Sequence, residues 1–228
     1  MRKIITTICI LITFANHVFS QSIERPNHAL KSHETLEIVK IEITDESTKL
    51  YLVIENRITG GTFCADRNII LIDPEGLKMN LRRSSGIPVC PESYIFKGIG
   101  EKLQFTLDFP PLKAGTQWVD LIEECASNCF WFYGVTLDND LNKKLDEAFY
   151  LASKNKPADN MTLFKNLLDN IDSQNLGIEG LLYINIINAA RENADNVGMS
   201  VWYKRLAASH APRVDQYIKY LNDLGIKY

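Results

Sequence analysis

The sequence predicts an antiparallel β-sandwich over residues 35–137, followed by an all-α domain of helical hairpins over residues 138–228. Three observations carry this prediction. Apolar and polar residues alternate along the first region, which is typical of half-buried strands. Turn residues separate these runs at short intervals, as they do in sandwiches. Beyond residue 138 the strand signals nearly vanish and helix start signals replace them.

The β half contains about eight short runs with strand character. The clearest is 103–109, where leucine and phenylalanine alternate with polar residues without interruption. Further apolar or aromatic runs are 50–55, 67–72, 77–82, 93–97, 118–123 and 129–137. Turn residues lie between them at 60–61, 73–76, 98–100, 110–111 and 114–115. The length and spacing therefore favour one compact sandwich domain.

The α half predicts five helices in a row. Asp138 or Asn139 can cap the first helix, and Pro157 is a start signal for the second. The predicted helices cover 138–154, 161–172, 177–192, 195–209 and 212–224. Gly225 follows the last one, where a helix-ending residue belongs.

Two family resemblances refine these regions. The segments 86–91, 103–111, 120–123 and 130–135 resemble an immunoglobulin-like module of exported bacterial proteins. Such a module often precedes a thioredoxin-like domain; here helices stand in that place, so no redox role is implied.

The helical half resembles a degenerate tetratricopeptide array over about 141–228. Two hairpins repeat with an offset of 38 residues for Asn155 and Asn193, and of 39 for Leu163 and Trp202. The run 202–207, followed by Pro212, is similar to the second helix of such a repeat. The resemblance implies that polar residues of each hairpin's first helix line a concave groove that takes a peptide.

The first 20 residues have the layout of a secretory signal peptide. Arg2 and Lys3 give a positive start, residues 4–14 form an apolar run, and a cleavage site follows Ser20. We therefore expect an exported protein in the periplasm or at the cell surface. The segment 21–34 is polar, contains Pro26 and predicts a flexible leader.

Composition excludes two classes of partner. Signal cleavage would leave 23 Lys and Arg against 28 Asp and Glu, so the net charge would move from −3 to −5. A nucleic-acid footprint needs a clustered basic face, which this chain lacks. No apolar stretch after the signal approaches the ~20 residues of a membrane span. The expectation is neither a nucleic-acid partner nor a transmembrane segment, and the oligomeric state stays open.

Four cysteines follow the signal peptide, and all four lie in the β half. Three disulfide connectivities are possible. We favour Cys64–Cys90, because a hairpin about the turn at 73–76 brings the two strands together, and Cys125–Cys129, because a short loop can close on itself. Zinc binding lacks the paired CxxC spacing, and a redox pair lacks CxxC at a helix start.

No catalytic, metal or cofactor site emerges from the residue pattern. The histidines after the signal are His28, His33 and His210, and none is spaced to bind a metal with another. The expected site is instead a binding face on the third helix. Asn185, Asn188 and Glu192 fall at i, i+3 and i+7, on one polar face.

These observations favour a non-enzymatic binding or assembly protein of the cell envelope, in which the helical array docks a protein or peptide. Two alternatives remain open. One is an enzyme whose site lies at the junction of the two halves. The other is a carbohydrate- or surface-binding module that uses aromatic residues such as those at 131–133.

Overall fold

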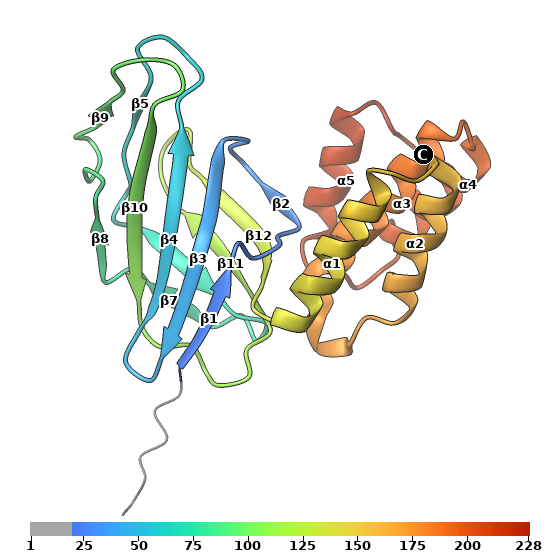
Figure 1. Ribbon diagram of the computed structural model, residues 1–228, viewed down its shortest axis with the longest axis horizontal. Helices are drawn as coiled ribbons and strands as arrows, with labels where there is room; N and C mark the ends of the chain where they lie inside the picture. Colours follow the sequence, from blue (N-terminus) through green and yellow to red (C-terminus); the bar gives the residue numbers. More distant parts are fainter. Residues whose placement is uncertain (1–19) are drawn as a thin grey trace, which may run out of the picture.

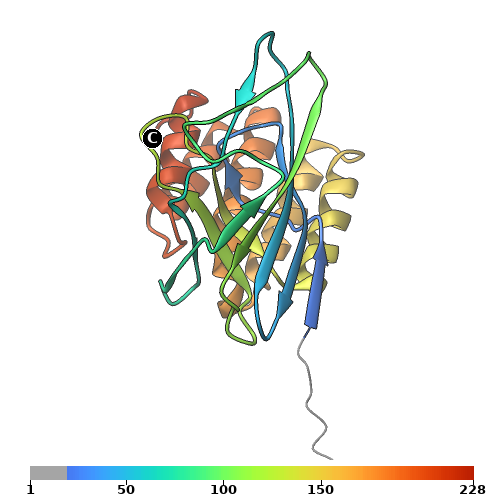
Figure 2. The ribbon, with the colours of Figure 1, turned by 90° about the vertical axis from the view of Figure 1, so that its left-hand side faces the viewer.

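The computed structural model describes residues 20–228, so the predicted signal peptide, apart from Ser20, lies outside the described residues. Antiparallel sheets form the N-terminal part and helices the C-terminal part (Figure 1). Figure 2 shows the helices gathered on one side of the sheets. The strands are β1 (Ser20–Glu24), β2 (Leu30–Lys31), β3 (Leu36–Thr44), β4 (Thr48–Glu55), β5 (Thr62–Phe63), β6 (Ile69–Ile72), β7 (Lys78–Asn80), β8 (Arg83–Ser85), β9 (Tyr94–Ile95), β10 (Lys102–Phe109), β11 (Trp118–Glu123) and β12 (Trp131–Thr136).

Two five-stranded sheets share one hydrophobic core. The first has the order β1-β3-β4-β10-β8 and the second β2-β12-β11-β6-β7, while β5 and β9 form a separate pair. The predicted alternation places its apolar residues inward: Leu103, Phe105, Leu107 and Phe109 of β10 are all buried. They join buried side chains of the second sheet, such as Phe132, in the same core. We call this part the β region.

The prediction of a flexible leader at 21–34 is wrong. β1 pairs with β3 along its whole length, and β2 pairs with β12. Ile23 pairs with Ile41 of β3, and its side chain is completely buried in the core that the two sheets share. The segment between these strands crosses from the first sheet to the second, and Asn27 fixes it to Asn142 of the helical region through its backbone N–H, 2.7 Å from Oδ1.

His28 lies in this crossing segment, and burial lowers its pKa from 6.5 to about 4. The unfolded chain therefore takes up a proton at a higher pH than the folded chain. We expect stability to fall as the pH drops from 6.5 towards 4, by about 3 kcal/mol at the lower end. Urea unfolding at several pH values measures this slope. His28→Gln should flatten it, and an unchanged slope in that variant would contradict the assignment.

The helical region begins directly after β12. Its elements are α1 (Asn139–Ala152), α2 (Pro157–Asp169), the 3₁₀ helix η1 (Ser173–Ile178), α3 (Glu179–Glu192), α4 (Asn196–Ala207) and α5 (Val214–Asp223). Of the two predicted caps it is Asp138 that caps α1, because its Oδ1 accepts the N–H groups of Asp140 and Leu141. Among the described residues, no helix combines the length and apolar character needed to cross a lipid bilayer.

α3 is the central helix of this region. Seven of its residues are buried: Gly180, Leu182, Ile184, Ile186, Ile187, Ala189 and Ala190. Leu182, Ile184, Ile186 and Ile187 belong to a second core, to which α1, α2, α4 and α5 also contribute. Because the other helices cover α3 on several sides, little of its surface is left exposed to line an open groove.

The two regions meet at a close backbone contact. Gly134 of β12 has a φ of +61°, and an ideal Cβ there would lie 2.0 Å from the carbonyl oxygen of Gly177 in η1. A Cβ at Gly177 would in turn lie 2.4 Å from the ring of Trp118. Glycine at both positions therefore allows η1 to lie directly on the second sheet.

An ion pair between a buried carboxylate and a half-buried arginine lies beside this contact. Asp120 of β11 is 2% exposed; its Oδ1 accepts the N–H of Gly134 at 2.8 Å and its Oδ2 accepts Nε–H of Arg213 at 2.9 Å. Arg213 precedes α5 in a left-handed conformation, with its guanidinium 5.3 Å from the ring centre of Tyr133. Side chains thus tie α5 to the second sheet.

Candidate functional site

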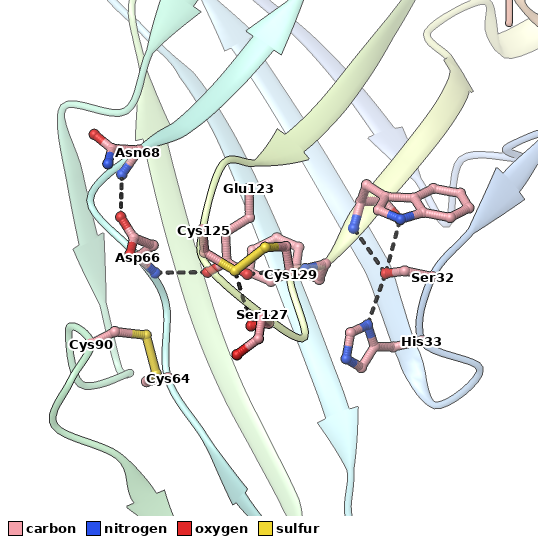
Figure 3. Close-up of a disulfide and its surroundings, with 12 residues drawn as sticks. Ser32, His33, Cys64, Asp66, Asn68, Cys90, Glu123, Cys125, Ser127 and Cys129 are labelled. Atoms are coloured by element: carbon pink, nitrogen blue, oxygen red, sulfur yellow. Dashed lines mark hydrogen bonds between the residues drawn. A yellow bond between two sulfur atoms is a disulfide. The ribbon is translucent and has the colours of Figure 1, made fainter. Parts of the chain in front are cut away.

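Both disulfides border a pocket of about 680 Å³ at one end of the β region (Figure 3). Cys64 is joined to Cys90 and Cys125 to Cys129, which is the pairing favoured from the sequence. Sequence reasoning missed that the two bridges lie at the same end. That placement follows from the strand order, in which β6 and β11 are neighbours.

Glu123 links the two disulfide-bonded segments. It is buried at the end of β11, and its carboxylate accepts the N–H of Asp66 at 2.7 Å and of Phe130 at 3.0 Å. Asp66 lies two residues after Cys64, and Phe130 directly follows Cys129, so one side chain holds both walls of the pocket (Figure 3). Burial raises the pKa of this carboxyl, and the two backbone N–H groups oppose the rise.

We expect Glu123→Gln to lower the free energy of unfolding by about 2 kcal/mol, since a buried N–H loses its acceptor and faces an amide donor. Urea denaturation measures the change. Glu124→Gln is the matched control, because Glu124 is exposed and forms a surface ion pair with Lys78 at 3.5 Å; its expected cost is below about 0.5 kcal/mol. Equal costs for the two variants would show that the carboxylate does not hold the walls.

Three exposed isoleucines lie beside the pocket. Ile58 and Ile99 are each 65% exposed and Ile95 is 71% exposed. Ile58 lines the pocket itself, and the other two lie on the neighbouring segment around β9. We call Ile58, Ile95 and Ile99 the isoleucine tip; β5 and β9 mark its position in Figure 1.

Hydrogen bonds hold the isoleucine tip in place. The buried amide of Asn56 donates to the carbonyl oxygens of Ile58 and Gly98, both at 2.8 Å, and so joins the two loops. The Tyr94 hydroxyl donates to Glu101 at 2.7 Å, which lowers the pKa of that carboxyl. The isoleucines are thus displayed on fixed backbone rather than on free loops.

The polar lining of the pocket is mixed. Glu55 pairs with Arg57 at 2.9 Å, and the His33 ring contacts the Ser32 hydroxyl through Nδ1 at 2.8 Å. Burial lowers the pKa of His33. Among the described residues, no group of three or more His, Cys, Asp or Glu side chains is placed to hold a metal ion.

The predicted binding residues of α3 lie far from this pocket in the chain and have different surroundings. The Asn185 amide donates to Leu181 of its own helix at 2.8 Å. The Asn188 side-chain oxygen is buried without a hydrogen-bond partner among the described residues, and Glu192 is exposed. Their role in binding stays a prediction, and the half-burial of the two asparagines favours packing for both.

The aromatic run at 131–133 divides between the two faces of β12. Phe132 is completely buried in the core. Trp131 and Tyr133 point to the other face, where their rings stack 4.3 Å apart and both are half-buried.

At the junction of the two regions, the buried carboxylate of Asp120 accepts hydrogen bonds from the Arg213 side chain and the Gly134 N–H.

Comparison with known proteins gives no match, either to the model of a protein family or to a curated protein sequence.

Proposed function

We propose that this chain is an exported, non-enzymatic binding protein of the cell envelope that docks an apolar segment of a partner protein on the isoleucine tip. The observation that carries the proposal is the display of Ile58, Ile95 and Ile99 in water on rigid backbone. Exposed apolar groups on loops that are already fixed avoid the backbone part of the entropy cost of binding, so they favour protein association.

Two further observations support an extracytoplasmic role and a recognition fold. Both disulfides bound the proposed docking end, and such bonds persist outside the cytoplasm. Two facing antiparallel sheets with a shared core support the immunoglobulin-like assignment, and the successive helical hairpins support a tetratricopeptide-like one. In this proposal the helical region braces the sheets rather than forming the docking groove itself.

The proposal predicts that partner capture depends on the tip. A photo-reactive amino acid at position 95 of the full chain should cross-link one defined protein in envelope extract. Combining Ile58→Ser, Ile95→Ser and Ile99→Ser should weaken binding of that protein at least about tenfold, because exposed anchors that become buried carry most of an interface's energy.

Two controls locate the effect. Leu77→Ser changes a residue that is 60% exposed in the turn between β6 and β7, and should leave capture unchanged. Glu192→Ala tests the face of α3 and should also leave it unchanged. Undiminished capture by the triple isoleucine variant would overturn the proposal, and loss with Glu192→Ala alone would return the site to the helices.

A further inference from the structure

A second cavity lies between the two regions, away from the isoleucine tip. It has a volume of about 550 Å³, within the size range of pockets that hold small ligands. The crossing segment 25–28 forms one wall, β3 and β4 of the first sheet form another, and Phe149 of α1 with Leu181 of α3 closes it. We call it the His28 groove.

The groove has an apolar floor on a face that is otherwise polar. Along β4, the residues that alternate with the buried ones are Lys49, Tyr51, Val53 and Glu55. Val53 is thus the one aliphatic member, and it lies in the groove together with Val39 of β3. Phe149 and Leu181 line the same space, so this side of the groove is apolar, while Arg25, Asn27, His28 and Glu37 form its polar side.

Arg25 supplies a positive charge in the lining of this groove. The residue is exposed, and its backbone adopts a left-handed conformation with φ of 46°, held by the N–H bond to Val39 O at 3.0 Å. Within residues 20–228, its guanidinium takes part in no ion pair or hydrogen bond. The acidic lining residue Glu37 is already paired with Lys31. The charged group of the lining that is available to a ligand is therefore the Arg25 guanidinium, which is positive.

We propose that the His28 groove binds an aliphatic monocarboxylate of medium chain length, with its chain on Val39 and Val53 and its carboxylate on Arg25. A guanidinium fits a carboxylate with two parallel hydrogen bonds, and the apolar floor matches an alkyl chain. This site is independent of the isoleucine tip, so either proposal can fail alone.

Fluorescence titration of the full chain with 11-(dansylamino)undecanoic acid tests the site. Emission should rise on binding, and decanoate should displace the probe. Decanol, which has the same chain without the charge, should displace it at least about tenfold less well, since it offers no charge-assisted hydrogen bond. Equal displacement by decanol, or no binding of the probe, would overturn the proposal.

Two substitutions test whether the probe binds in the His28 groove. Arg25→Gln should weaken binding of the probe about tenfold, whereas Arg67→Gln, which removes an exposed arginine elsewhere, should leave it unchanged. Val53→Thr keeps the shape of the side chain and should weaken binding severalfold. Thermal unfolding of each variant shows that the fold persists. Unchanged affinity in both Arg25→Gln and Val53→Thr would exclude this groove as the site.

Discussion

Gly134→Ala should lower the free energy of unfolding by about 4 kcal/mol. Two costs combine: an alanine with φ near +61° pays about 1 kcal/mol, and its Cβ would lie 2.0 Å from the Gly177 carbonyl oxygen, which is backbone and cannot rotate away. The second sheet and η1 must then separate, and contacts on both sides of the junction are lost. Urea denaturation followed by circular dichroism measures the change.

Gly76→Ala is the matched control for Gly134→Ala. Gly76 also has a positive φ, +83°, but an added Cβ there would meet nothing within 4 Å. Its expected cost is the conformational part alone, about 1 kcal/mol. Gly177→Ala, whose Cβ would lie 2.4 Å from the Trp118 ring, should resemble Gly134→Ala. Similar costs for Gly134→Ala and Gly76→Ala would mean that the two regions do not press together at this point.

Local patterns predicted most of the elements, because each element carries its own periodicity. The run 118–123 matches β11 to the residue, and the five helices lie within a few residues of their predicted positions. β1 was missed because a polar strand with one buried residue, Ile23, has no local signal. β1 is stabilised by pairing with β3, some 20 residues later in the chain. A pattern within a few residues cannot predict that pairing.

The candidate sites depended on contacts that the sequence does not display. The disulfide pairing could be argued from one turn and one short loop, but no local pattern singles out Glu123. Its role requires that residues 66 and 130 meet at its carboxylate. The His28 groove and the isoleucine tip likewise arise from segments that are distant in sequence, such as Arg25 and Leu181.

Asp120→Ala should lower the free energy of unfolding by about 4 kcal/mol, as much as Gly134→Ala. The carboxylate is buried, and its loss leaves the Gly134 N–H without an acceptor and Arg213 without its partner. Arg213→Met should cost less, about 2 kcal/mol, because Asp120 can take up a proton once the cation is gone. The double variant should cost less than the sum of the two, by about 1 to 2 kcal/mol, as expected for groups in direct contact.

The pH dependence of the free energy of unfolding shows whether Asp120 and Arg213 interact through their charges or through packing alone. Burial raises the pKa of Asp120 above its usual 3.8, and Arg213 opposes the rise. The folded chain therefore holds this proton to a higher pH than the unfolded chain, so this group's contribution to stability falls as the pH rises from 3.8 through the raised pKa. Removing Arg213 lifts the pKa further and should extend the fall to higher pH. If Arg213→Met loses the same free energy at pH 5 and pH 7, the guanidinium does not act on Asp120 through its charge, and α5 is held to the second sheet by packing alone.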